Sequence, residues 1–367
     1  MKPLFTILKI GLGFVKPEDI DSNDFCTMEQ KDWMELRLMA DKQAVSAIAF
    51  DGLSQIINTS GRDKICPNID YGWWQQLVFD WIGIAHQTEY RNLQQKKVMD
   101  ELADIWSSQG CRVMIFKGQA NAIIYPKPDY RSPGDIDCYL FNDYSRGNEV
   151  AKGNGATVDE GWYKHSQILY KGELFENHRY FVHTRDGKRG KQLEKELEEV
   201  LNMDSSGFLH YSSHVLIPPY QWVAMFQTYH ACAHFLSEGL RLKQVLDWAM
   251  FLEKHQNDVD WKSYYEFCDR NHLRKFADAM TSICVEYLCV NITLSDIYCH
   301  SPYTERVLND MLYNDDYIYS EGLGAWECRK QVIKNLFKHR WKYEEIYDEN
   351  VWQQLWYYVS GFLLNKE

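Results

Sequence analysis

The chain contains 367 residues, of which 45% are hydrophobic and 25% are charged, and its formal net charge is −12 at pH 7. This composition is typical of a folded globular protein, and the length suggests about two domains. An acidic chain repels a phosphate backbone, so duplex nucleic acid is not an expected partner, and no apolar run reaches the roughly 18 residues of a membrane span.

Residues 1–108 are predicted to be helical. The first twenty residues look superficially like a signal peptide, but Lys9 interrupts the apolar run and no small-x-small cleavage site follows, so we expect a short amphipathic helix. Further along, the stretch WWQQLVFDWIGIAHQTEYRNLQQKKVMDELADIWSSQG carries apolar residues at three-and-four spacing. It ends at Gly110, a typical helix stop, and predicts one long helix.

Residues 109–189 lack the long helical periodicity of the preceding segment, and their pattern predicts a small α/β core. Short apolar runs and turn residues indicate a buried strand, a short helix, a proline-rich loop, a second strand and a strand pair joined by "GE". The stretches are CRVMIF (111–116), GQANAIIY (118–125), PKPDYRSPG (126–134), DIDCYLF (135–141), SQILYK (166–171) and LFENHRYFVHT (174–184). Residues 190–367 again read as helices. We therefore predict an α+β protein whose small mixed-sheet core is flanked by N-terminal and C-terminal helical regions.

Two aspartates in the second predicted strand, Asp135 and Asp137, carry the functional argument. Residues i and i+2 of a strand face the same side, so both carboxylates would lie on one face. Two carboxylates repel each other unless a cation lies between them, and Mg²⁺ or Mn²⁺ is the usual solution. Two such ions assist in-line phosphoryl or nucleotidyl transfer. The alternative is a structural pair that Lys117 and Arg131 neutralise.

The same triplet pattern occurs twice more, at Asp19–Asp21 and at Asp258–Asp260. The first lies among turn residues, and a solvated loop explains it. The second ends directly before WKSYYEF, where Asp260 is well placed to cap a helix. Neither of these triplets is predicted to bind a metal.

The segment before the aspartates predicts a phosphate-binding site. A strand, then Gly118, then a helix start lets backbone N–H groups approach an anion closely. Lys117 and Arg131 would add a point charge and a bidentate guanidinium for the same anion.

These residues also resemble a known family. The stretch FKGQANAIIYPKPDYRSPGDIDCYL is similar to the signature of the uncharacterised nucleotidyltransferase family of the DNA polymerase beta nucleotidyltransferase superfamily: K-G, a small residue, Tyr, Arg and D-I-D. FENHRYF resembles that family's strand with Glu-x-His, and YHACAHFLSEGLRLKQVLDWAMFL resembles its helical part, more loosely. The resemblance covers most of the chain.

The resemblance implies roles for individual residues. Asp135 and Asp137 match the two metal-binding carboxylates. The third carboxylate of the family lies on a later strand, binds the catalytic metal and helps to deprotonate the acceptor. Glu176 matches it best, with Glu173 as the alternative.

It also implies that Gly118 opens the helix that binds the triphosphate. The superfamily usually has Gly-Ser at this point, whereas this chain has Gly118-Gln119, so the serine contact to phosphate is absent. Lys117 is expected to compensate, with Arg131 as a further phosphate ligand. The proline-rich loop makes the distance from Gly118 to Asp135 longer than usual.

The expected activity is transfer of a nucleoside monophosphate from an NTP to a hydroxyl of a small molecule or protein, with Mg²⁺ or Mn²⁺ and release of pyrophosphate. Two alternatives remain open at this point. The missing serine favours a nucleotide-binding or regulatory module that has lost catalysis. An antitoxin-like protein that modifies or binds a protein partner is the other.

Three further features have mainly structural interpretations. His230 and His234 lie on one face of a predicted helix, but without a third ligand a packed pair is expected rather than zinc. The family resemblance places this segment opposite the strand with the aspartates, which leaves a contact with the substrate open. Arg241 and Asp247 are expected to form an ion pair, with a place in the lining of the cleft as the alternative. The basic stretch 328–342 is predicted to be a solvated helix face, with an anion-facing wall as the alternative.

The ten cysteines include no C-x-x-C pair and no zinc-finger spacing. Several lie in apolar runs such as CRVMIF and SICVEYLCV. This placement favours buried, reduced thiols and a cytoplasmic location.

Overall fold

The computed structural model describes residues 2–21, 23–183, 187–203, 207–294, 297, 300–314 and 325–364. Helices surround a single mixed sheet, which confirms the predicted α+β class. One of the ten cysteines, Cys299, and the end of the predicted strand at Thr184 fall outside these residues.

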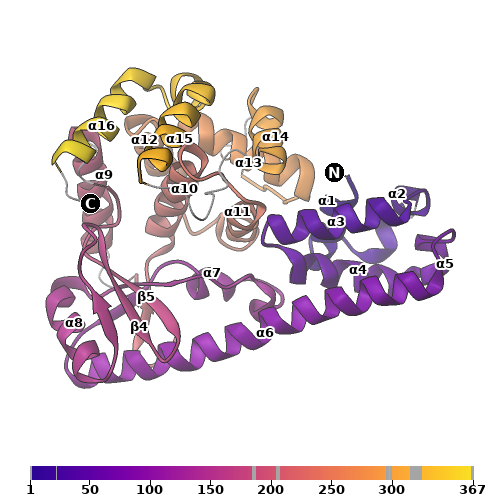
Figure 1. Cartoon of the computed structure of the whole chain (residues 1–367), viewed down its shortest axis with the longest axis horizontal. Coiled ribbons are helices and arrows are strands. Elements are labelled where there is room, and N and C mark those ends of the chain that lie inside the picture. Colours follow the sequence, from indigo (N-terminus) through magenta and orange to yellow (C-terminus); the bar gives the residue numbers. More distant parts are fainter. Residues whose placement is uncertain are drawn as a thin grey trace.

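The long predicted helix dominates the N-terminal part. Helix α6 runs along the molecule from the first helices to the sheet (Figure 1). Asp70 caps its start by accepting from the Trp73 N–H, and Gly110 follows its end with φ at +79°. The helices that precede the sheet are α1 (Lys2–Gly11), α2 (Asn23–Cys26), α3 (Gln30–Lys42), α4 (Ser46–Ser60), α5 (Arg62–Ile65) and α6 (Tyr71–Ser108).

Helix α1 is present as expected, and most of its residues are buried. Leu4, Phe5, Ile7 and Leu8 are at most 3% exposed. Its backbone approaches α4 so closely that a Cβ added at Gly52 would lie 1.8 Å from the Ile7 carbonyl oxygen. Glycine is therefore required where the two helices meet.

Among the described residues, seven strands form one sheet in the order β3-β4-β5-β2-β1-β7-β6. The central strand β2 pairs antiparallel with β1 and parallel with β5, and β5 pairs antiparallel with β4. The strands are β1 (Val113–Ile115), β2 (Ile136–Tyr139), β3 (Thr157–Asp159), β4 (His165–Tyr170), β5 (Glu173–His178), β6 (Leu209–His210) and β7 (Val215–Ile217). Helices α7 (Gln119–Ala122) and α8 (Tyr144–Gly153) lie between them in sequence.

The predicted strand pair is present, with one adjustment to its turn. Strands β4 and β5 are joined by Lys171 and Gly172, both with positive φ, rather than by "GE". Positive φ at both central residues is typical of a tight hairpin turn.

The sheet extends beyond the predicted 109–189 segment. Strand β7 pairs in parallel with β1 and lies after α9 (Gly187–Met203), so residues 209–217 complete a sheet that begins about 100 residues earlier. The boundary predicted at residue 189 thus falls before the last two strands.

The two faces of the sheet pack against different helices. One face forms a core with α6 and α8 through residues such as Ile136, Phe175 and Trp106. The other face, through Met114 and Phe116, joins the core of the N-terminal and C-terminal helices. The C-terminal helices are α10 (Tyr220–Leu236), α11 (Leu242–His255), α12 (Trp261–Arg270), α13 (Arg274–Leu288), α14 (Thr304–Tyr313), α15 (Ala325–Lys338) and α16 (Val351–Leu364).

None of the helices in the described ranges has the length and apolar character of a membrane span.

Candidate functional site

The pairing of β2 with β5 brings three carboxylates together. Asp137 lies directly opposite Glu176 in the parallel register, and Asp135 precedes β2 on the same face. One carboxylate oxygen from each of Asp135, Asp137 and Glu176 lies within 4.8 Å of the others. Glu173 sits three positions earlier on β5, where it accepts from the Gln95 amide at 3.5 Å. Glu176 is therefore the acid that the sheet brings to the aspartates.

The intervening residues explain why the carboxylates face one way. Ile136, Cys138 and Phe175 are at most 3% exposed and pack into the core against α6 and α8. Because strand side chains alternate, burying these residues directs Asp137 and Glu176 to the opposite face. This is the face toward the C-terminal helices.

Asp137 is the most enclosed acid of the group and already has two partners. It is 2% exposed, its Oδ1 lies 2.5 Å from Nζ of Lys117, and the same Oδ1 lies 2.9 Å from Nε2 of His178. Burial alone would raise the pKa of Asp137, but Lys117 and His178 hold it well below its usual range. The residue is therefore ionised at neutral pH.

Asp135 and Glu176 differ from Asp137 in their environment. Burial and the neighbouring Asp137 raise the pKa of Asp135 to about 6. Burial also opposes ionisation of Glu176, but the interaction with His178 lowers its pKa below the usual value. The three acids thus carry more negative charge than Lys117 neutralises, which is the condition that favours cation binding.

Two histidines adjoin Glu176. Nε2 of His178 lies 3.3 Å from one carboxylate oxygen of Glu176, and Nε2 of His165 lies 3.4 Å from the other. His165 lies opposite His178 in the pairing of β4 with β5. Burial lowers the pKa of His165 to about 4, so this ring is neutral at pH 7.

Two further lysines lie near the acids. Lys164 is close enough to Lys117, Asp137 and Glu176 for their charges to interact, and burial lowers its pKa. Lys243, at the start of α11, has its Nζ 3.6 Å from the position of a Cβ built on Gly134, and burial lowers its pKa to about 8. Neither lysine forms an ion pair with the described residues.

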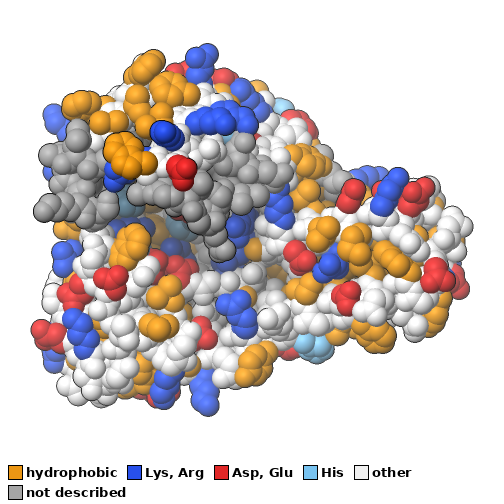
Figure 2. Space-filling model, in the orientation of Figure 1, with side chains coloured by type: hydrophobic (Ala, Val, Ile, Leu, Met, Phe, Trp, Pro, Cys, Tyr) orange, Lys and Arg blue, Asp and Glu red, His pale blue; other side chains and the backbone are white. Residues whose placement is uncertain are grey.

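Figure 2 shows a hollow on this side of the molecule between the sheet and the C-terminal helices, where acidic, basic and histidine side chains gather. His230 of α10 lies near Lys117 and Lys164: burial holds the pKa of His230 well below the usual value, and the two lysines lower it further. Its ring lies 4.5 Å from that of His234, centroid to centroid, as a packed pair. Among the described residues neither ring belongs to a possible metal cluster.

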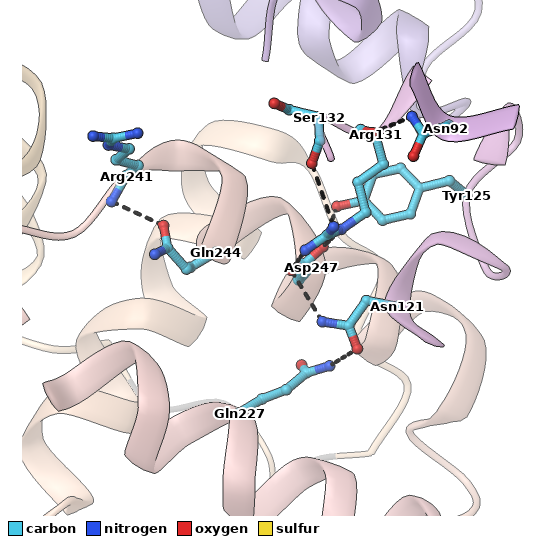
Figure 3. Close-up of polar contacts among 9 residues, drawn as sticks. All are labelled: Asn92, Asn121, Tyr125, Arg131, Ser132, Gln227, Arg241, Gln244 and Asp247. Atoms are coloured by element: carbon cyan, nitrogen blue, oxygen red, sulfur yellow. Dashed lines mark hydrogen bonds and ion pairs between the residues drawn. The ribbon is translucent and has the colours of Figure 1, made fainter. Parts of the chain in front are cut away.

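Arg131 does not reach the acids and instead forms a buried network with α11 (Figure 3). Its Nε and a terminal nitrogen each donate to Asp247 at 2.7 Å, and Tyr125 and Asn121 donate to the same carboxylate at 2.7 and 3.0 Å. The expected pairing of Asp247 with Arg241 is wrong, because Arg241 lies apart and its N–H donates to Gln244.

The segment around Gly118 also differs from the expected phosphate-binding helix. Helix α7 has only four residues, and Gln119 is buried, where its amide donates to Asn92 and Gln95 of α6 at 2.7 and 2.8 Å. Gly118 has φ at +55°, and a Cβ there would lie 3.3 Å from the Asp135 carbonyl oxygen. Glycine at 118 thus allows the β1–α7 turn to pass directly beside the site.

The remaining predicted features have structural positions. Asp260 caps α12 by accepting from the Ser263 N–H at 3.2 Å, as expected. In the basic stretch, Lys330 and Lys334 are exposed on α15. Lys342, however, is fully buried, bonded to Asp310 and to the Phe235 carbonyl, so it belongs to no solvated face.

Sequence reasoning missed His165, Lys164 and Lys243 as neighbours of the acids. His165 had a usable signal, because it directly precedes the predicted strand 166–171 that pairs with the Glu-x-His strand, and a hairpin register places it opposite His178. Lys243 had no such signal in the sequence. It lies more than 100 residues after the D-I-D triplet, and its position near the acids depends on how α11 packs against the rest of the chain.

Comparison with known proteins identifies the family of this chain. Comparisons with curated proteins and with solved structures found no match. The model of a family described as uncharacterised nucleotidyltransferases matches residues 29–288, which include the whole sheet and helices α3 to α13. The chain therefore belongs to the uncharacterised nucleotidyltransferase family.

Proposed function

We propose that this protein transfers a nucleoside monophosphate from an NTP to a hydroxyl of a small molecule or protein, with divalent cations bound at Asp135, Asp137 and Glu176. One observation carries the proposal: three carboxylates from β2 and β5 lie within 4.8 Å of one another on the face toward the C-terminal helices. Membership in a nucleotidyltransferase family supports the same reaction class.

The residues fit a divalent cation because hard oxygen donors converge with net negative charge. Such ions would supply positive charge at the α-phosphate and at the oxygens that attack and leave. The acceptor oxygen forms a bond to the α-phosphorus while the bond to the bridging oxygen breaks, and pyrophosphate departs. Glu176, beside the two aspartates, accepts the hydroxyl proton.

The triphosphate in this proposal is held by lysines rather than by the missing serine. Lys164 and Lys243 flank the acids without an ion-pair partner among the described residues, and a polyanion would supply one. Lys117 forms an ion pair with Asp137 and so connects the lysines that would hold the triphosphate with the carboxylates that would hold the cations. Arg131 acts indirectly, because its ion pair with Asp247 fixes the loop before Asp135.

The proposal is tested by the melting temperature and by pyrophosphate release. An NTP and Mg²⁺ together are expected to raise the melting temperature more than either alone, since a ligand at 100 times its Kd stabilises by about 2.7 kcal/mol. Asp135→Asn should abolish this synergy, and in the presence of a productive acceptor should slow pyrophosphate release at least about a hundredfold. Asp135 is preferable to Asp137 for this test, because Asp137 is buried with two partners and its substitution would perturb folding.

Lysine variants localise the triphosphate. Lys243→Met should weaken NTP binding, whereas Lys330→Met, on the exposed face of α15, should not. If the NTP and Mg²⁺ shift no melting curve singly or together, and Asp135→Asn changes nothing, the carboxylates are structural and the proposal is wrong.

A second candidate, a nucleotide-binding module without catalysis, is favoured by one observation. Asp137 already has cationic and histidine partners within the chain, so part of its charge is balanced without a metal. This candidate predicts the same thermal synergy but no pyrophosphate release with any acceptor pool.

A further inference from the structure

The third carboxylate belongs to a second group of ligand atoms that contains nitrogen. One donor atom from each of His165, Glu176 and His178 lies within 4.8 Å of the others, and the two imidazoles approach opposite oxygens of Glu176. Carboxylate oxygens suit Mg²⁺ and Mn²⁺, whereas imidazole nitrogens suit Zn²⁺, Fe²⁺, Co²⁺ and Ni²⁺. The site therefore differs from an all-oxygen magnesium site.

His178 is oriented as a ligand by its second nitrogen. Nδ1 lies 3.1 Å from the Tyr180 carbonyl oxygen, which can only accept, so Nδ1 carries the hydrogen. Nε2 then faces Asp137 at 2.9 Å and Glu176 at 3.3 Å. A metal ion at this point would bind the ring nitrogen together with oxygens of both carboxylates. A backbone carbonyl bound to Nδ1–H is the usual support of a metal-binding histidine.

His165 provides an independent observation. Both of its ring nitrogens are buried and lack a hydrogen-bond partner in the described part of the chain, although buried polar groups are normally bonded. Nε2 lies 3.4 Å from Glu176 without hydrogen-bond geometry, and the ring packs between His178 and Trp162, with centroids 5.2 and 6.0 Å away. A metal ion between Nε2 and the carboxylate would satisfy the nitrogen.

We propose that His165, His178 and Glu176, together with Asp137, bind a divalent transition-metal ion in preference to Mg²⁺. The inference deepens the proposed function, on which it rests for the role of the ion: one of the two cations of the nucleotidyl-transfer site has nitrogen ligands. Asp135 and the NTP phosphates remain as oxygen ligands for the other.

The test uses the full chain, stripped of metal with a chelator, and Co²⁺ alone as the probe. Co²⁺ is expected to bind without nucleotide, with a visible absorption that an excess of Mg²⁺ does not readily remove. His165→Gln should weaken Co²⁺ binding about tenfold or more. His86→Gln is the matched control, because His86 also lies 3.3 Å from a glutamate but on the exposed side of α6. Equal Co²⁺ affinity of His165→Gln and the unmodified chain would overturn the inference, as would displacement by equimolar Mg²⁺.

A second measurement needs no variant. Bound Co²⁺ shifts the exchangeable ring N–H proton of a ligating histidine far outside the normal NMR range, and the bonded Nδ1–H of His178 should give such a signal. Absence of any shifted exchangeable proton in the Co²⁺ complex would mean all-oxygen ligation and would overturn the inference.

The outcomes separate the two proposals. Histidine-dependent Co²⁺ binding without synergy between NTP and a divalent cation would sustain the metal site and contradict the nucleotidyl-transfer function. Synergy without histidine-dependent Co²⁺ binding would sustain the function and contradict the transition-metal site.

Discussion

Two buried ionic clusters adjoin the loop that precedes β2, and they differ in how their charge is balanced. In the first, Asp247 accepts four hydrogen bonds from Arg131, Tyr125 and Asn121, and one full negative charge meets one full positive charge. In the second, Asp135, Asp137 and Glu176 lie together and Lys117 pairs with Asp137, while the nearby Lys164 forms no ion pair with the described residues. The residue types are similar, but only the second cluster has charge left for a ligand.

This difference separates a structural role from a binding role. A carboxylate with every oxygen satisfied by its own chain gains nothing from a metal ion. An incompletely neutralised group of acids is destabilised by its own repulsion and relaxes when a cation binds. Identity of residues alone does not separate these cases, because Arg131 and Lys117 are both basic residues beside the same triplet.

The largest expected effect comes from breaking the balanced cluster. Asp247→Ala leaves the Arg131 guanidinium, which is 5% exposed, without a partner. Removing one member of a buried pair typically costs about 3–5 kcal/mol. We expect a loss of that size in the free energy of unfolding, measured by urea denaturation.

Asp278→Ala is the control for this loss. Asp278 pairs with Arg274 four residues away on α13, where both side chains are partly exposed, and should cost no more than about 0.5 kcal/mol. The double change Arg131→Met with Asp247→Leu should recover part of the lost stability, since no charge is left buried. Similar losses for Asp247→Ala and Asp278→Ala would contradict the balanced-cluster description.

The sequence predicted one cluster much better than the other. Alternation along a strand was enough to place Asp135 and Asp137 on one face, and the family resemblance supplied Glu176. The partner of Arg131 lies 116 residues later, on a helix whose packing no local pattern specifies. Arg131 was therefore assigned to a phosphate on chemical type alone.

The same limit applies to the fold. Helix α6 was predicted closely, because its apolar spacing and Gly110 are both local signals. Strand β7 was missed, because its parallel pairing with β1 depends on the intervening chain. Helix α7 is shorter than predicted: Gln119 and Ala120 pack inward, and the chain turns by Tyr125, before the prolines.

A smaller effect, the change of stability with pH, tests the repulsion among Asp135, Asp137 and Glu176. The pKa of Asp135 is raised to about 6 in the folded chain from an ordinary value near 3.8, so the folded state holds this proton more tightly than the unfolded state. The stabilising contribution of that proton is complete below about pH 4 and is lost as pH rises through 6.

The unmodified chain should therefore lose stability relative to Asp135→Asn between pH 4 and pH 7, by about 1 kcal/mol once solvent screening is allowed for. Urea denaturation of both proteins across this range measures the difference, and groups common to both cancel. Addition of Mg²⁺ with an NTP should remove this pH-dependent loss of stability. Parallel stability curves for the two proteins would show that Asp135 does not experience the repulsion described here.

The smallest expected effect concerns the other two aspartate triplets, at Asp19–Asp21 and Asp258–Asp260. It tests whether metal binding depends on the position of a triplet in the fold rather than on its residues. Asp19 lies on an exposed turn beside Pro17, and Asp258 is half-exposed and bonded to His255 at 2.9 Å. Neither has a second strand that delivers a third acid, and among the described residues neither belongs to a possible metal cluster. Changing Asp19 and Asp258 to Asn together should leave the Mn²⁺ affinity unchanged and the stability within about 0.5 kcal/mol. Electron paramagnetic resonance of free Mn²⁺ during a titration measures the affinity directly. A drop comparable to that of Asp135→Asn would mean that the metal binds outside the β2–β5 cluster, and both the comparison of the clusters and the assignment built on it would fail.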